Sequence, residues 1–134
     1  MEHLPGLEEA FKKAKVVFMT TFSGDKENTR QMTNYNDSPF VKFWFPTEKD
    51  TKKVKDIIAN PKILITFPSV NRKEFFEIEG EASFADPSEV EEKWEWWWLY
   101  WHPSQKDRFW FPPSKDDKRV LIYVQPKKVR LIKK

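Results

Sequence analysis

The clearest indication of the fold class is the stretch Val16-Val17-Phe18-Met19-Thr20-Thr21-Phe22-Ser23-Gly24-Asp25. Residues 16–22 are apolar or β-branched and are followed by Ser-Gly-Asp, which is typical of a strand that ends in a turn. Residues 29–35 alternate loosely between polar and apolar side chains and end at a second turn, residues 36–39. Strands separated by so short a turn predict antiparallel pairing.

The rest of the chain extends this pattern. Further strands are predicted over residues 40–45, 62–67, 74–85 and 119–125, with residues 129–132 as an extension of the last one. Helices are predicted over residues 7–14, 52–60 and 86–101. Because these helices do not alternate regularly with strands, we expect one mainly β domain over residues 1–134, an antiparallel sheet or barrel with a few peripheral helices.

Several local signals refine the predicted elements. Pro46 is expected to close the third strand, and Gly80 indicates a bulge or a close approach of two backbones. In the helix over residues 52–60, Val54, Ile57 and Ile58 are predicted to share one face, with Asp50 or Thr51 as the N-cap. Asp86 is expected to cap the third helix.

Composition excludes several classes of site. The chain has 134 residues and no cysteine, which removes disulfides, thiolate metal sites, iron–sulfur clusters and cysteine nucleophiles. Only His3 and His102 are present, too few for a multi-histidine metal cage. Lys and Arg number 24 against 21 Asp and Glu, and this near balance argues against a nucleic-acid or anionic-membrane partner.

The sequence also gives an expectation of cellular location. Aromatic residues make up 16% of the chain, which is typical of a folded domain rather than a disordered one. No apolar run approaches the roughly 18–20 residues of a membrane span. Residues 1–5, Met-Glu-His-Leu-Pro, lack the basic and apolar regions of a signal peptide, so a cytoplasmic protein is expected.

Two segments are candidates for anion binding. Arg30 lies in a predicted strand and could bind a phosphate or carboxylate through two parallel hydrogen bonds, or it could be a solvated charge at a strand edge. Residues 47–53 join a strand to a helix, where Thr47 and Thr51 supply hydroxyls, Lys53 a charge and the helix N-terminus free N–H groups. The alternative is an ordinary capped helix with a lysine-rich soluble face.

Residues 94–101 form a dense aromatic block, Trp-Glu-Trp-Trp-Trp-Leu-Tyr-Trp. At helical spacing, its aromatic stripe predicts core contacts on one side and a subunit interface on the other. A wall that stacks on a ligand ring is the second interpretation, and an interfacial membrane helix is the third. His102, next to Pro103 at the predicted helix end, is interpreted as structural.

An ordered set of motifs runs through most of the chain. These are Arg30-x-Met32, Phe43-Trp44-Phe45-Pro46-Thr47, Asp50-Thr51-x-Lys53-Val54, Ala59-Asn60-Pro61 and Phe75-Phe76-Glu77-Ile78-Glu79-Gly80-Glu81-Ala82. In this order and at these spacings, the sequence resembles the pyridoxamine phosphate oxidase-like split-barrel flavoproteins, specifically their general stress protein branch. The resemblance covers roughly residues 16–129.

The resemblance implies a six-stranded antiparallel split barrel that forms a homodimer and binds FMN in two equivalent sites at the dimer interface. It implies that Arg30 contacts the FMN phosphate and that Thr47, Thr51 and Lys53 complete the phosphate site. The residues implied to lie along the isoalloxazine are Gln31, Met32, Thr33, Phe45 and Pro46. Trp110 is the first candidate for an aromatic wall from the partner subunit, with Phe109 and Trp101 as further ones.

The expected function is that of an FMN-dependent oxidoreductase acting on a small-molecule redox substrate, with NADH or NADPH as candidate electron donor. The chain ends in residues 129–134, Val-Arg-Leu-Ile-Lys-Lys, without the Arg-Leu-x-Pro of the vitamin B6 oxidases, so pyridoxamine phosphate is not the expected substrate. One alternative is a non-catalytic module of the same fold that binds flavin, F420, heme, a nucleotide or a protein partner. Another is a single-stranded nucleic-acid binder that uses residues 127–134.

Overall fold

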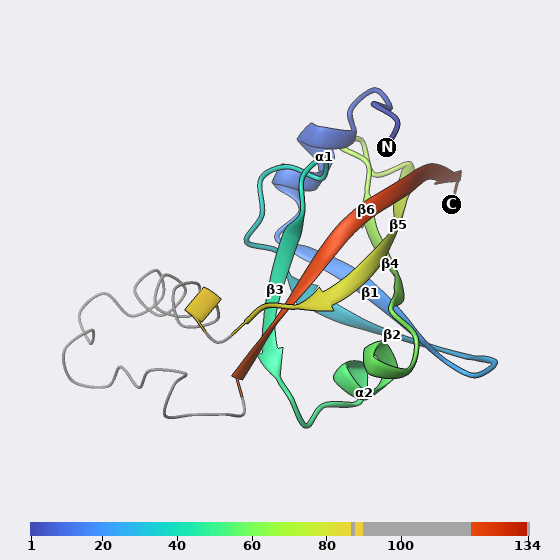
Figure 1. Cartoon of the computed structure of the whole chain (residues 1–134). Coiled ribbons are helices and arrows are strands. Elements are labelled where there is room, and N and C mark those ends of the chain that lie inside the picture. The colour runs from blue at the N-terminus through green and yellow to red at the C-terminus, as the bar shows by residue number, and fades with distance from the viewer. Residues whose placement is uncertain (87, 90–118, 134) are drawn as a thin grey trace.

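Six strands, each antiparallel to its neighbours, make one curled sheet in the computed structural model, which describes residues 1–86, 88–89 and 119–133 (Figure 1). Along the sheet the strands follow the order β2-β1-β4-β5-β6-β3, so β2 and β3 are its edges. Their bounds are β1 Val16–Ser23, β2 Lys26–Thr33, β3 Phe43–Glu48, β4 Lys62–Pro68, β5 Glu74–Phe84 and β6 Arg119–Lys133. The prediction of a mainly β, antiparallel fold is confirmed.

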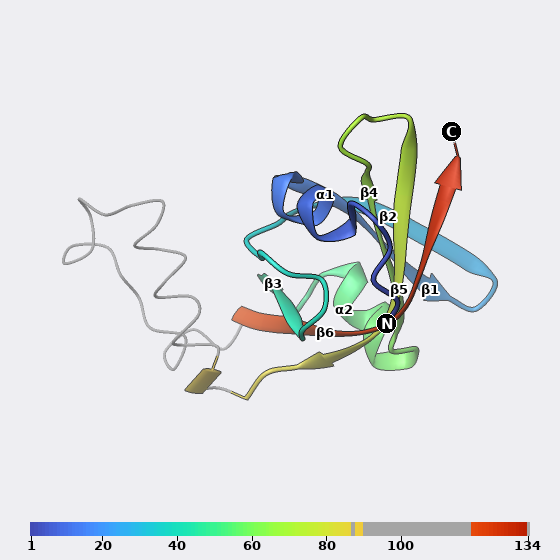
Figure 2. The same cartoon turned by 90° about the horizontal axis from the view of Figure 1, so that it is seen from above.

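The described residues also contain two helices, α1 (Leu7–Lys13) and α2 (Lys52–Ala59). They lie near opposite ends of the curled sheet (Figure 1). The β1–β2 hairpin projects beyond the rest of the sheet in both that view and the view from above (Figure 2). Within the described residues, no helix is long and apolar enough to cross a membrane.

The core lies inside the curl of the sheet, where alternate strand positions face inward. In β4, Ile63, Ile65 and Phe67 are buried and alternate with partly exposed neighbours, as expected for a strand with one face on the core. From α1, the ring of Phe11 lies 5.1 Å from that of Phe43 and 5.4 Å from that of Phe67. Helix α1 therefore closes one end of the core.

Strand β2 ends two residues earlier than predicted, and its neighbour Asn34 explains why. The Asn34 side chain donates to the carbonyl oxygens of Phe11 and Ala14, at 3.0 and 3.1 Å, and so turns toward α1. Its Oδ1 accepts from the backbone N–H of Asn36 at 3.0 Å. These bonds satisfy a buried amide at the point where the chain leaves the sheet.

Strand β3 begins three residues later than predicted and continues through Pro46 to Glu48, so the expectation that Pro46 ends it was wrong. Proline has no backbone N–H, so within an interior strand it would leave a neighbouring strand without a hydrogen-bond donor. In an edge strand, the proline nitrogen can face the side that has no paired strand. Pro46 is opposite Leu121 on β6, the strand that pairs with β3. Phe40, expected at the start of the strand, instead stacks on His3 with ring centroids 4.0 Å apart.

Gly80 lies at a bulge, as predicted. The register of β5 against β6 shifts between Glu79 and Gly80. A Cβ at Gly80 would lie 2.7 Å from Val124 Cγ1 and 3.0 Å from the backbone oxygen of Gln125, so no larger residue fits without a shift. Gly80 is opposite Pro126, and β6 continues through this proline as one strand of 15 residues, so the predicted extension over residues 129–132 is confirmed.

The start of the third predicted helix is confirmed at its cap. Asp86 Oδ1 accepts from the backbone N–H of Glu89 at 3.1 Å and from the Ser88 hydroxyl at 2.7 Å. Residues 88 and 89 are helical, and the Tyr123 hydroxyl donates to Glu89 at 2.6 Å. The aromatic block 94–101, His102 and the candidates Phe109 and Trp110 lie outside the described residues.

Candidate functional site

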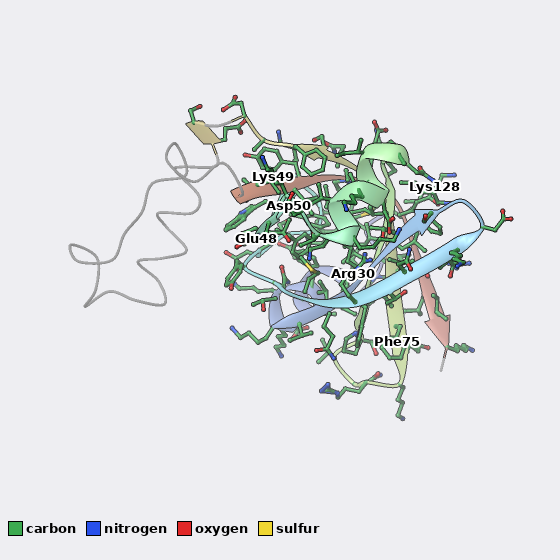
Figure 3. The ribbon with its side chains drawn as sticks, turned by 90° about the horizontal axis from the view of Figure 1, so that it is seen from below. Arg30, Glu48, Lys49, Asp50, Phe75 and Lys128 are labelled. Carbon is green, nitrogen blue, oxygen red and sulfur yellow. The ribbon has the colours of Figure 1, made fainter. Side chains whose placement is uncertain are left out.

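Helix α2 and the β1–β2 hairpin together position the candidate site. Along β2, half-buried Asn28, Arg30 and Met32 alternate with exposed residues and therefore share the inward face. The Arg30 side chain is 23% exposed, so the interpretation as a solvated strand-edge charge was wrong. Figure 3 shows Arg30 between β2 and α2, with residues 48–50 on the connection that enters the helix.

Helix α2 is rotated differently from the prediction. Val54 and Ile57 are buried as expected, but Ile58 is 73% exposed. Asp56 is buried in its place, with 2% exposure, and Lys53 is half-buried. The helix therefore turns a carboxylate and an ammonium toward the hairpin.

Asp56 is the centre of a buried polar cluster. Its Oδ2 accepts from the Thr21 hydroxyl at 2.7 Å and from Asn28 Nδ2 at 3.0 Å, and its Oδ1 pairs with the Lys52 ammonium. The hydrogen bond from Lys52, together with those from Thr21 and Asn28, lowers the pKa of Asp56 despite the opposing effect of burial. Asp56 is thus an ionised carboxylate that accepts hydrogen bonds from Thr21, Asn28 and Lys52.

Arg30 is connected to this cluster through Thr21. Arg30 Nη1 donates to Thr21 Oγ1 at 2.8 Å, while Arg30 Nη2 is 3.9 Å from Asp56 Oδ2. Burial lowers the pKa of Arg30 and the Asp56 charge opposes that effect, but a guanidinium stays protonated at any physiological pH. Within the described residues, Nη1 is the Arg30 nitrogen that donates a hydrogen bond, so the remaining donors are available to a ligand.

Lys53 faces Arg30 and has no counter-ion among the described residues. Burial and then the positive charge of Arg30 lower the pKa of Lys53. In the part of the chain that the structure describes, its ammonium forms no hydrogen bond or ion pair, whereas the adjacent Lys52 is paired with Asp56. Two cations brought together in a partly desolvated place are unfavourable until an anion joins them. This is the electrostatic character of an anion-binding site.

The connection from β3 to α2 adds polar groups. Thr47 is 8% exposed on the inward face of β3, and its hydroxyl has no hydrogen-bond partner among the described residues. The Thr51 hydroxyl donates to the backbone oxygen of Glu48 at 2.8 Å. Thr51 is the N-cap residue as predicted, but its side chain does not cap the helix, so the first N–H groups of α2 have no side-chain partner from the described residues.

The five residues expected along the isoalloxazine do not share one face. Gln31 and Thr33 are exposed on the outward side of β2, opposite Met32, which packs against the core. On β3, Phe45 is completely buried in the core and Pro46 faces the other way. The structure therefore brings together the phosphate candidates Arg30 and Lys53, and it distributes the ring candidates over both faces of two edge strands.

Sequence reasoning missed Thr21 and Asp56. Thr21 was read only as a β-branched strand former, although its inward position next to Arg30 follows from the pairing of the two strands. Asp56 lies three residues after Lys53, the spacing that places two side chains on the same helix face. A helical projection that put Lys53 on the buried side would have found Asp56 as well.

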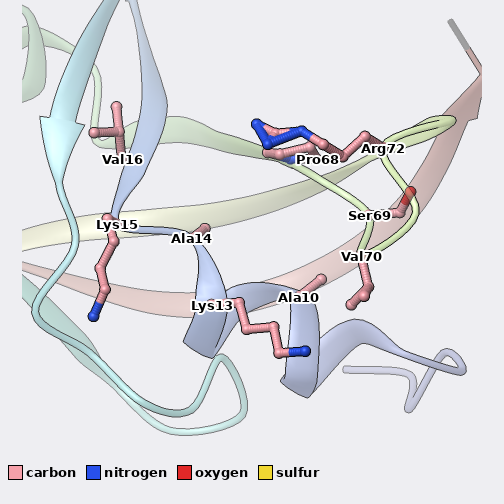
Figure 4. Close-up of a pocket in the computed structure, with 9 residues that line it drawn as sticks. All are labelled: Ala10, Lys13, Ala14, Lys15, Val16, Pro68, Ser69, Val70 and Arg72. Carbon is pink, nitrogen blue, oxygen red and sulfur yellow. The ribbon is translucent and has the colours of Figure 1, made fainter.

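A groove elsewhere on the molecule is a poorer candidate. It has a volume of about 460 Å³ and lies between α1, the start of β1 and the β4–β5 turn (Figure 4). Its charged side chains, Lys13, Lys15 and Arg72, are all exposed, and Lys13 already pairs with Glu9 at 3.0 Å. Since none of these charges is held in place by burial, the site is assigned to α2 and the hairpin.

Known proteins resemble this chain over nearly its whole length. Residues 2–131 match a family model described as Pyridoxamine 5'-phosphate oxidase like. General stress protein 26 of Bacillus subtilis (strain 168) is 27% identical over 121 residues, 88% of this chain and 79% of the relative.

Two solved structures are similar to this chain in fold. An F420 reductase is similar with a TM-score of 0.68 and 17% identity, over 96% of this chain and 98% of the reductase. An FAD-binding protein of Mesorhizobium loti is similar with a TM-score of 0.66 and 14% identity, over 94% of this chain and 92% of that protein. At these identities the two structures show a shared fold.

Proposed function

Because the chain belongs to the pyridoxamine 5'-phosphate oxidase-like family, we propose that it is an FMN-binding oxidoreductase. The observation that carries the proposal is the half-buried Lys53, which faces Arg30 with no counter-ion among the described residues. The names of two structural neighbours, an F420 reductase and an FAD-binding protein, add support for a flavin or a related cofactor. FMN is favoured because it ends in a phosphate monoester, the group that such a pair of cations binds well.

The residues present fit that phosphate. Arg30 offers the N–H donors that Thr21 does not occupy, and Lys53 offers an ammonium. The Thr47 hydroxyl and the first N–H groups of α2 are further donors without a described side-chain partner. When bound, FMN supplies hydride or electron transfer, and the protein supplies binding, orientation and electrostatics.

The isoalloxazine is proposed to lie against the edge strands. Gln31 and Thr33 would contact it through exposed side chains, and Pro46 through its partly exposed ring. Met32 and Phe45 point into the core, so only their backbone could reach the cofactor. Trp110 keeps its proposed place in the partner subunit's aromatic wall.

The rest of the proposal concerns assembly and chemistry. A homodimer is proposed, as the sequence resemblance implies, with a small-molecule redox substrate and NADH or NADPH as the candidate donor. The sheet supports this assembly because its edges, β2 and β3, have backbone groups that pair with no other described strand and could pair with a partner. The cytoplasmic location stays a prediction, which cell fractionation would test.

The visible absorption spectrum tests the cofactor directly. Purified protein is recorded before and after addition of FMN and desalting. Retained flavin bands, with about one FMN per chain by the family resemblance, are expected, and a protein that retains none would contradict the proposal. Reduction of the bound flavin by NADH or NADPH, with transfer to an acceptor, separates an enzyme from a flavin-binding module without turnover.

A further inference from the structure

The geometry points to Thr21 as a positioning residue that fixes the orientation of Arg30 for a phosphate ligand. This inference rests on the proposed function, since it assigns a role within the same site. Thr21 is completely buried on β1, and its hydroxyl is the described group that accepts a hydrogen bond from the guanidinium. It would act through Arg30 and not through contact with the ligand.

The direction of the hydrogen bonds makes this assignment specific. Arg30 has only donors, so Thr21 Oγ1 must accept at 2.8 Å. The Thr21 proton then goes to Asp56 Oδ2, 2.7 Å away, because an ionised carboxylate only accepts. The hydroxyl is therefore polarised by a buried charge behind it, which strengthens the bond that it accepts from Arg30.

No direct bond replaces this connection. Arg30 Nη2 and Asp56 Oδ2 are 3.9 Å apart, beyond hydrogen-bond distance. Arg30 lies on β2, an edge of the described sheet, so on one side no described strand confines its guanidinium. The Thr21 hydroxyl thus holds the Nη1 end of the guanidinium, and the N–H groups that donate to no described residue form a prearranged fork for a ligand. Prearrangement increases affinity because less side-chain freedom is lost on binding.

A threonine-to-valine exchange tests the role without changing any charge. Thr21→Val keeps the shape and removes the hydroxyl, and Thr21→Ser keeps the hydroxyl as the matched control. The dissociation constants of FMN and riboflavin are measured for each variant by quenching of flavin fluorescence. Riboflavin lacks the phosphate, so the ratio of the two constants isolates the phosphate contribution.

The expected result is specific to FMN. Thr21→Val should weaken FMN binding about tenfold, the effect of losing one hydrogen bond to a charged group, and leave riboflavin binding unchanged. Thr21→Ser should bind both flavins as the unaltered protein does. In an Arg30→Ala background, Thr21→Val should have no further effect on the ratio, because the residue through which it acts is gone.

Other outcomes overturn the inference. Equal losses of FMN and riboflavin binding in Thr21→Val would make Thr21 merely structural, and so would a ratio that falls as much without Arg30 as with it. If the unaltered protein does not prefer FMN to riboflavin, the proposed phosphate site itself is wrong, and the role of Thr21 with it. A preference retained in Thr21→Val rejects the role of Thr21 alone.

Arg30→Lys provides a second test should Thr21→Val not fold. This variant keeps the charge on a partly exposed edge-strand position but loses the planar fork. Loss of the FMN preference, comparable to that in Arg30→Ala, supports a positioned guanidinium. An unchanged preference shows that charge alone suffices and rejects the positioning role.

Discussion

Two adjacent lysines of α2 have different electrostatic environments. Lys52 is 59% exposed at its side chain and is paired with Asp56, whereas Lys53 is half-buried and faces Arg30. Asp56 thereby neutralises the Lys52 ammonium, whereas the Lys53 ammonium has no ion-pair partner among the described residues. At the scale of single residues, this difference between neighbours of the same type defines the candidate site.

Removal of Arg30 or Lys53, the two cations proposed to bind the phosphate, should weaken FMN binding. Arg30→Ala and Lys53→Ala should each cost about 1.5–3 kcal/mol, roughly ten- to a hundredfold in the dissociation constant, because each loses a charge-assisted contact to the phosphate. Lys55→Ala, an exposed lysine of the same helix, is the matched control and should have little effect. Fluorescence titration measures all three, and equal affinities in the three variants would remove the site assignment.

The charge of Asp56 should make stability depend on pH in the acid range. Its hydrogen bonds lower the pKa in the folded protein below the value of about 3.9 for an unperturbed aspartate. The stabilisation is therefore complete above that value and is lost as the pH falls through the folded-state pKa. Urea denaturation from pH 7 to pH 3 should show Asp56→Asn less stable than the unaltered chain at neutral pH, with the difference shrinking toward pH 3. A constant difference would show that the carboxylate charge does not contribute.

At the scale of elements, the sequence predicted the bounds of the helices and strands better than it predicted which of their faces is buried. Helix α2 was placed within one residue, yet its buried side was expected to include Ile58 and instead includes Asp56. A prediction from hydrophobicity alone places the apolar residues of the helix on its buried face. The observed orientation is explained by the polar partners of Asp56 on β1 and β2. Those partners come from residues 21–30, which no local pattern in the helix reveals.

The rotation of α2 predicts unequal effects of two neighbouring substitutions. Ile57→Ala should cost about 2–5 kcal/mol, because it leaves a cavity under the helix. Ile58→Ser should change the unfolding free energy by less than about 0.5 kcal/mol, since its side chain is exposed. Denaturant unfolding of both variants measures the difference, and equal losses would indicate that Ile58 is covered in the native assembly.

The close approach at Gly80 predicts that even a methyl group is costly there. Gly80→Ala should destabilise the protein by about 1–3 kcal/mol, because the new Cβ would collide with Val124 and the backbone of Gln125. Ser83→Ala, an exposed position on the same strand, serves as the control. A Gly80→Ala protein as stable as the control would mean that β6 can move away without cost.

At the scale of the whole molecule, the sequence predicted the fold class, and the antiparallel sheet confirms it. That prediction rested on the short turns and on the resemblance to a known family, because both can be recognised in contiguous stretches of sequence. The site was predicted less completely. Arg30 and Lys53 lie inside the motifs, whereas Thr21 and Asp56 gain their meaning only when a hairpin and a helix meet. The contact of the ring candidates with an isoalloxazine stays a prediction.

The proposed assembly predicts the mass of the protein in solution. Light scattering after size-exclusion chromatography should give twice the 16.2 kDa of one chain. The edge strands β2 and β3 and the exposed apolar side chains beside them provide the surface that a partner would cover. A single-chain mass at micromolar concentration would contradict the homodimer.

The strand order also has a consequence for the time course of folding. The β1–β2 and β4–β5 pairs join neighbours in the chain and can form quickly, whereas β3 pairs with β6 across most of the sequence. Thr21 and Arg30 belong to the β1–β2 hairpin, which we expect to form early. Helix α2 follows directly after β3, which can pair only after β6 has been made. We therefore expect Arg30 to reach its final position early in folding and Lys53 to reach its position late. The proposed FMN site would then be completed only near the end of folding.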